Sequence, residues 1–130
     1  MAEGKAEVSV DAAPGEVWKL VRDFGALGEW MPGIESCTLD GDVRTLGMMG
    51  IEIKEQLREL DDDHRRISYS VVASPMGNLE SHLATISVDP EGAGSHVTWS
   101  VEVAPDEMLG LFLPVYEGSI GEIKKKVERA

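Results

Sequence analysis

The chain has 130 residues, with 12 Lys and Arg against 24 Asp and Glu, so its formal net charge is -12 and its pI about 4.5. A chain of this length is expected to form one domain, residues 1–130, with a core of its own. The excess of acidic residues argues against nucleic-acid binding, which needs a basic face, and against attachment to anionic membranes.

The single cysteine, Cys37, excludes an internal disulfide and suits a reducing compartment. The first residues contain no apolar run, and no stretch approaches the ~20 apolar residues that a membrane-spanning helix needs. We therefore expect a cytoplasmic protein with no membrane span.

The N-terminal quarter predicts one strand followed by two short helices. Apolar and polar residues alternate over residues 5–10, which is typical of a strand with one solvated face. Pro14 suits a first helical position, and the apolar stripe of the helix that follows is Val17, Leu20, Val21 and Phe24. Several Gly and Pro residues then leave room for only a short second helix, centred on residues 27–31.

Six strand-like segments follow, at residues 34–40, 43–46, 51–60, 66–73, 79–88 and 96–103. Short turns join them, which predicts an antiparallel meander. In the last quarter, apolar residues recur at spacings of three and four, as a helix requires: Leu109, Phe112, Tyr116, Ile120, Ile123 and Val127. Pro114 should either kink this helix or start its regular part, so we expect residues 108–113 to be a partly separate, mobile piece.

This order of elements predicts an α+β fold in which one face of a sheet is covered by the long helix. A strongly bent sheet around a helix often leaves a space between the two. Glu55 is the most informative residue in this respect, because it shares the apolar face of its strand with Ile51, Ile53 and Leu57. A carboxylate on an inward face is costly unless it is paired, hydrated or protonated. Glu55 therefore indicates either a cavity or a strand end that reaches solvent.

His82 is a second candidate, because it shares a strand face with Ala84, Ile86 and Val88. If that face is the inward one, Glu55 and His82 could form an acid–base or ligand-anchoring pair. The alternatives are a core histidine bonded to backbone, or a histidine near the cavity mouth in contact with water. His82 stands apart from other metal-ligand residues, so no metal site is predicted. No phosphate-binding or dinucleotide motif is present, and no cofactor is expected.

The remaining candidates are apolar residues that could line a cavity or its mouth. Methionines near loops would give an adaptable lining, and aromatic residues would give rigid walls. The alternative is that the same residues seal a packed core. With Glu55 and His82, the candidate ligand-binding residues are Trp30, Met31, Met48, Met49, Ile53, Tyr69, Met76, Trp99, Phe112 and Tyr116.

The sequence resembles the START-like superfamily, whose small bacterial members are often described as polyketide cyclase/dehydrase-like or SRPBCC proteins. The motifs that carry this resemblance lie at residues 17–24, 30–34, 60–70, 98–100 and 116–118. The resemblance covers nearly the whole chain. It implies a helix-grip fold, in which a curved seven-stranded antiparallel sheet encloses an apolar cavity around a long C-terminal helix, with two short helices after the first strand.

A more distant resemblance is to the plant abscisic acid receptors, in which two loops act as gate and latch. The matching loops would be residues 47–50 and 74–78. The pocket glutamate, tyrosine and lysine of the receptors would fall on Glu55, His82 and Met31. Because the lysine is replaced, the resemblance does not carry over recognition of a ligand carboxylate.

The leading functional hypothesis is that the chain binds a small hydrophobic molecule such as a lipid, polyketide or hormone-like compound. The first alternative is a cyclase or dehydratase that uses Glu55 and His82 as acid and base. The second alternative is a protein-interaction or chaperone-like module, which would need an exposed apolar patch. Whether the chain catalyses a reaction, which ligand it takes and whether it forms a homodimer are left open by the sequence.

Overall fold

The computed structural model describes residues 2–75 and 79–128. Its elements, in chain order, are β1 (Ala2–Val10), α1 (Pro14–Val21), the 3₁₀ helix η1 (Phe24–Glu29), β2 (Ser36–Asp40), β3 (Val43–Met48), β4 (Ile51–Asp61), β5 (Arg66–Ala73), β6 (Ser81–Glu91), β7 (Gly94–Ala104), the 3₁₀ helix η2 (Asp106–Met108) and α2 (Leu109–Glu128). The predicted order of one strand, two short helices, six strands and a long helix is confirmed.

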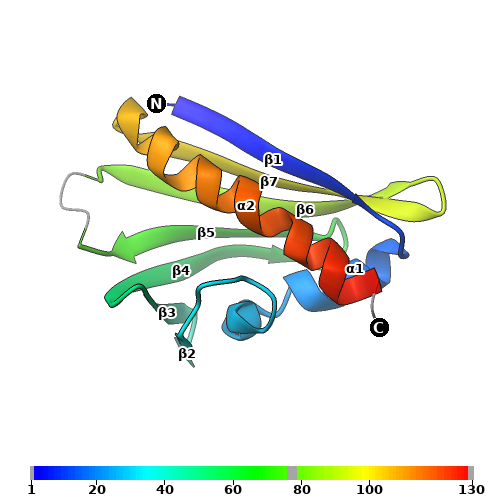
Figure 1. Ribbon diagram of the computed structural model, residues 1–130, viewed down its shortest axis with the longest axis horizontal. Coiled ribbons are helices and arrows are strands. Elements are labelled where there is room, and N and C mark those ends of the chain that lie inside the picture. The colour runs from blue at the N-terminus through cyan, green and yellow to red at the C-terminus, as the bar shows by residue number, and fades with distance from the viewer. Residues whose placement is uncertain (1, 76–78, 129–130) are drawn as a thin grey trace.

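All seven strands form one antiparallel sheet in the order β1-β7-β6-β5-β4-β3-β2. The long helix α2 crosses one face of this sheet diagonally (Figure 1) and packs mainly against β1 and β7. The α+β helix-grip fold predicted from the sequence is therefore confirmed. Because α2 packs mainly against β1 and β7, it covers the β3–β4 side of the same face less closely.

The core lies between α2 and the face of the sheet to which the strands turn their apolar residues. On β7, Val97, Trp99, Val101 and Val103 alternate with more exposed residues, as the period of a half-buried strand requires. From the helix, Ile123 is fully buried against this layer. Burial of such side chains supplies roughly 25 cal/mol per Å² of apolar surface, which is the main term that holds helix and sheet together.

The start of α2 differs from the prediction for residues 108–113. The helix runs from Leu109 through Pro114 without a break, and buried Met108 ends η2 directly before it. Residues 109–113 are thus continuous with the rest of α2, and the regular helix does not begin at Pro114. Pro114 is the sixth residue of α2, where a missing N–H removes the hydrogen bond to the carbonyl of Gly110 near the helix end.

The β3–β4 hairpin is closed by a two-residue turn in which Met49 and Gly50 both have positive φ, of 52° and 78°. This is the arrangement of a type I′ turn, which favours Asn-Gly, and an unbranched residue such as Met pays a steric cost there. The Met49 side chain is 87% exposed, so packing does not repay that cost.

We expect Met49→Asn to raise the free energy of unfolding by about 1 kcal/mol, because Asn tolerates the left-handed conformation. Urea denaturation of both proteins would measure the difference. Met48→Asn, one position earlier and with ordinary strand geometry, is the control and should not stabilise. A Met49→Asn protein less stable than wild type would contradict the assigned turn.

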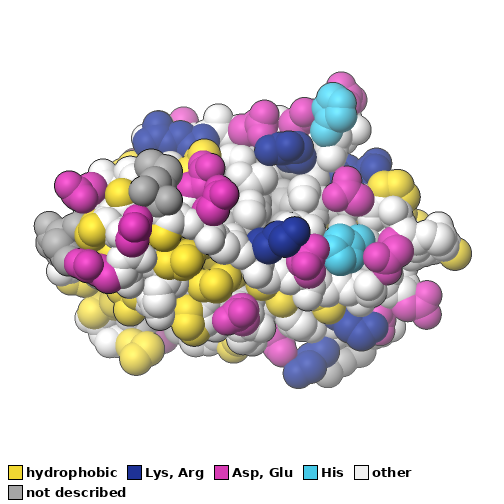
Figure 2. Space-filling model, turned by 90° about the horizontal axis from the view of Figure 1, so that it is seen from above, with side chains coloured by type: hydrophobic (Ala, Val, Ile, Leu, Met, Phe, Trp, Pro, Cys, Tyr) yellow, Lys and Arg dark blue, Asp and Glu magenta, His cyan; other side chains and the backbone are white. Residues whose placement is uncertain are grey.

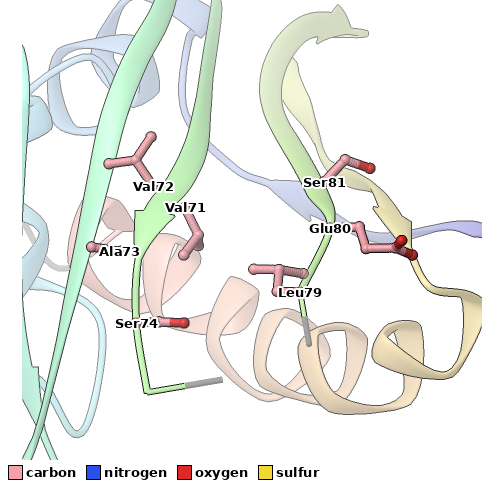
Figure 3. Close-up of a pocket in the computed structure, with 7 residues that line it drawn as sticks. All are labelled: Val71, Val72, Ala73, Ser74, Leu79, Glu80 and Ser81. Atoms are coloured by element: carbon pink, nitrogen blue, oxygen red, sulfur yellow. The ribbon is translucent and has the colours of Figure 1, made fainter. Parts of the chain in front are cut away.

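Strands β5 and β6 separate towards one end of the sheet. Their pairing runs from Arg66↔Ser87 to Tyr69↔Ala84 and then stops. Figure 3 shows the opening beyond this point, with Val71 and Leu79 between the two diverging chains. The Val71 N–H, which has lost its cross-strand partner, donates instead to Nδ1 of His82 at 3.1 Å. The imidazole of His82 thus links β6 to β5 where their backbone pairing ends.

Candidate ligand-binding site

A cavity of about 320 Å³ lies between α2 and the β3–β4 side of the sheet. Its walls come from the region of η1, from four strands and from α2. Among the lining residues, Glu55 alone is charged. The lining residues are Leu27, Met31, Leu46, Met48, Met49, Ile51, Ile53, Glu55, Tyr69, Trp99, Leu111, Phe112, Val115 and Tyr116. This volume is within the range of sites that bind small molecules.

The rim of the cavity is exposed and apolar. Met49 and Ile51 come from the β3–β4 hairpin, and Leu111 and Val115 from the first half of α2; all four are at least 39% exposed. Figure 2 shows hydrophobic side chains gathered towards the end of the molecule where α2 begins. Exposed apolar residues around an opening are suited to the entry of an apolar ligand.

The inner wall of the cavity contains a buried ion pair between Arg44 of β3 and Glu55 of β4. Their exposed fractions are 4% and 7%. Nε and Nη2 of Arg44 contact Glu55 Oε1 at 2.8 and 2.7 Å. The third contact of the guanidinium is a hydrogen bond from Nη1 to the Phe24 carbonyl at 3.0 Å.

The local strand geometry brings these two charges together. Arg44 and Glu55 are directly opposite in the β3–β4 ladder, so their side chains share one face. A register shift between Lys54 and Glu55 relative to β5 bends the strand at this point. The Arg44 guanidinium carbon also lies 4.0 Å from the centroid of the Phe24 ring and 4.7 Å from that of Tyr69, which provides cation–π attraction.

Burial raises the pKa of Glu55 above the usual glutamate range, and the charge and hydrogen bonds of Arg44 oppose that rise. The Arg44 guanidinium places a positive charge beside this wall, in contact with the Glu55 carboxyl group. An ionised Glu55 balances it. The cavity wall therefore presents a carboxylate while the pair as a whole is neutral.

A second polar network lies next to this pair and consists of Tyr69, His82, Trp99 and Tyr116. His82 Nε2 is 3.0 Å from the Tyr116 hydroxyl, and Trp99 Nε1 donates to the Tyr69 hydroxyl at 3.0 Å. The Trp99 and Tyr116 rings stack with centroids 4.3 Å apart. Burial lowers the pKa of His82 to about 4, so the ring is neutral at neutral pH. Burial also raises the pKa of both tyrosines, which stay protonated.

Most of the residues singled out in the sequence lie on the cavity wall: Met31, Met48, Met49, Ile53, Glu55, Tyr69, Trp99, Phe112 and Tyr116. Trp30 does not; it is buried behind the wall, edge-on to Trp99 with centroids 5.7 Å apart. Met76 lies outside the described residues.

His82 also lies behind the wall, where Tyr116 and Phe112 separate it from the cavity. Its strand face is the inward one, which the sequence left open, and its Nδ1 accepts from the Val71 N–H at the point where β5 and β6 separate. The structure does not bring Glu55 and His82 together as a hydrogen-bonded pair. Glu55 is paired with Arg44, and His82 with Tyr116 and backbone.

Six residues of the site and its wall were not predicted from the sequence: Arg44, Leu46, Leu27, Ile51, Leu111 and Val115. A signal for Arg44 was present in the hairpin. Because the turn consists of Met49 and Gly50, Met48 faces Ile51, and counting four residues outward from each places Arg44 opposite Glu55. The alternation pattern of a single strand does not identify a partner on the next strand. The Arg44–Glu55 pair can be predicted only once the turn has fixed the register of β3 against β4.

No group of three or more His, Cys, Asp or Glu within residues 2–75 and 79–128 is placed to hold a metal ion. The helices of that part of the chain are also too short or too polar to cross a membrane.

The curved antiparallel sheet, the long C-terminal helix and the cavity between them define a START-like helix-grip protein. The chain belongs to the family described as polyketide cyclase/dehydrase and lipid transport, which it matches over residues 1–128. No curated protein sequence matches it.

Solved structures share this fold over nearly the full chain. XoxI from Bacillus cereus is 28% identical with a TM-score of 0.90, covering 98% of this chain and 96% of that one. A protein from Thermobifida fusca is 25% identical with a TM-score of 0.83, covering 99% and 95%. Norcoclaurine synthase from Thalictrum flavum, at 20% identity and a TM-score of 0.79 with 99% and 87% covered, shows likeness of fold alone.

Proposed function

We propose that this protein binds a small, mainly apolar molecule in the cavity between α2 and the β3–β4 side of the sheet. The observation that carries the proposal is the composition of the wall, which is apolar or aromatic except for Glu55 and the tyrosine hydroxyls. An apolar body supplies affinity through burial, and a few polar groups fix its orientation.

The Arg44–Glu55 pair supports this assignment because it leaves one acceptor unused. Both Arg44 nitrogens contact the same oxygen, Oε1. Oε2 is then available to accept a hydrogen bond from a hydroxyl or amine of the ligand. The family description, which includes lipid transport beside cyclase and dehydrase, agrees with a role in handling apolar molecules.

Binding is favoured over acid–base catalysis by Glu55 and His82 because the two side chains have different partners. A general base needs to reach its proton directly or through one water. His82 is screened from the cavity by Tyr116, and Glu55 is held by a permanent cation. We therefore place the protein among carriers or receptors of apolar molecules.

The test is native mass spectrometry of the protein purified from its own host, followed by organic extraction of any bound molecule. A variant that fills the cavity provides the comparison: Ile53→Trp adds a large ring to the wall. We expect a co-purifying apolar molecule with wild type and its loss in Ile53→Trp, because the added side chain occupies the ligand's volume.

The matched control is Leu83→Trp, which adds the same ring on the outward face of β6, where Leu83 is 36% exposed. It should retain the bound molecule. Uptake of an apolar fluorescent probe by wild type and by Leu83→Trp, but not by Ile53→Trp, would give the same answer for a protein that loses its ligand in purification. Equal binding by all three proteins would contradict the assigned cavity.

A further inference from the structure

The hydrogen bonds behind the cavity wall have a fixed direction, which begins at the backbone of β5. The Val71 N–H can only donate, so Nδ1 of His82 must accept and carries no hydrogen. A neutral His82 then has its hydrogen on Nε2, which donates to the Tyr116 hydroxyl. The backbone thus selects the tautomer without reference to any ligand.

The direction of the hydrogen bond at Tyr69 is set by Trp99. An indole N–H is a donor only, so the Tyr69 oxygen accepts from Trp99 Nε1. The Tyr116 hydroxyl, which accepts from His82, lies near the Tyr69 hydroxyl and interacts with it. The bond from Trp99 therefore ends on the Tyr69 oxygen and does not use the hydrogen of the Tyr69 hydroxyl.

The hydrogen of the Tyr69 hydroxyl group is the next part of this network to be placed. Among the described residues the Tyr69 hydroxyl has one hydrogen bond, in which it accepts from Trp99, so its own hydrogen is not used there, although Tyr69 is 3% exposed and lines the cavity. A buried hydroxyl without an acceptor costs free energy, and a ligand that supplies one recovers it. The neighbouring charges are a balanced pair, since Arg44 is neutralised by Glu55.

We propose that the Tyr69 hydroxyl donates a hydrogen bond to a carbonyl-type oxygen of the ligand, so that the cavity selects uncharged apolar molecules bearing such an oxygen. This inference rests on the proposed binding function and names the chemical class that the site takes. An anionic ligand fits poorly, because the Glu55 carboxylate lines the same cavity and Arg44 offers no free charge. His82 and Trp99 are positioning residues that act through the tyrosines.

Three tricyclic probes of nearly equal shape test the inference: fluorene, 9-fluorenone and fluorene-9-carboxylate. With wild-type protein we expect the ketone to bind roughly three- to tenfold more tightly than the hydrocarbon, which is the contribution of one neutral hydrogen bond. The carboxylate should bind more weakly than the ketone. Infrared spectra of bound 9-fluorenone should show its carbonyl stretch at lower wavenumber than in hydrocarbon solvent.

Variants then assign the donor. Tyr69→Phe should bring the ketone-to-hydrocarbon affinity ratio close to one and abolish the infrared shift. Ser68→Ala removes another buried hydroxyl of β5, one that bonds Thr85 and does not line the cavity, and should leave the ratio unchanged. If Tyr69→Phe unfolds because Trp99 loses its acceptor, the wild-type ratio and infrared shift still decide the inference.

The outcomes separate the two proposals. Binding of no probe would overturn the proposed function itself. Equal binding of ketone and hydrocarbon, or an unshifted carbonyl stretch, would overturn the Tyr69 inference while leaving the binding function in place. Tightest binding of the carboxylate, or loss of the ketone preference in Tyr116→Phe but not in Tyr69→Phe, would also overturn it.

Discussion

Replacing Arg44 with Met is expected to lower the free energy of unfolding by ~3–5 kcal/mol, because it leaves a buried carboxylate without its counter-charge. The loss should be smaller at acidic pH. Arg44 opposes the burial-driven rise in the pKa of Glu55, so its removal raises that pKa further and allows protonation to relieve the cost. Urea denaturation at neutral and acidic pH would measure both effects.

The double variant Arg44→Met/Glu55→Leu is the informative partner of that experiment. Replacing both members of a buried pair with apolar residues is often neutral or stabilising, so most of the lost stability should return. Lys125→Met, which removes an exposed pair with Glu122 at 3.0 Å, should change stability by under about 1 kcal/mol. A double variant as unstable as Arg44→Met would show that Arg44 acts through Phe24 and not through Glu55.

The stability of the fold should fall as the pH is lowered from about 6.5 to about 4 because of His82. In the unfolded chain this group takes up a proton near its usual pKa of 6.5, whereas burial lowers its pKa in the folded protein to about 4. The unfolded state therefore binds more protons within this window. The contribution is complete above pH 6.5, is lost by about pH 4, and amounts to ~3 kcal/mol.

His82→Gln supplies the comparison, because glutamine does not titrate. Stability measured by urea denaturation at several pH values should show wild type losing its advantage over the variant as the pH falls through that window. Acidic groups with lowered pKa, such as Asp61 and Asp62, contribute equally to both proteins and cancel. Parallel stability curves for the two proteins would contradict a neutral His82 in the native state.

The fold could be predicted from the sequence because its signals are local. Alternation along β6 and β7 places Ala84, Ile86, Val97 and Trp99 in the core, as expected. The start of α2 could not be predicted in this way. Pro114 is a helix breaker by propensity, but it stands within the early part of the helix, and buried Met108 and Phe112 hold the residues on either side of the helix start.

The candidate site was harder to predict because it depends on pairs of residues. The inward direction of Glu55 followed from alternation, whereas its partner Arg44 depended on the hairpin register. His82 was on the correct face but was drawn aside by the separation of β5 and β6, which no local pattern signals. Side-chain partners across strands are thus the part that single-strand patterns leave undetermined.

The packing of α2 on β1 has a consequence for how the protein is made. These elements stand at opposite ends of the chain, at Leu109–Glu128 and Ala2–Val10, and they lie against each other in the finished fold. During synthesis the hairpins of the middle strands leave the ribosome before α2, the helix that forms one cavity wall. The cavity is therefore completed only after α2 has been synthesised, and until then the nascent chain exposes the inner apolar face of the sheet.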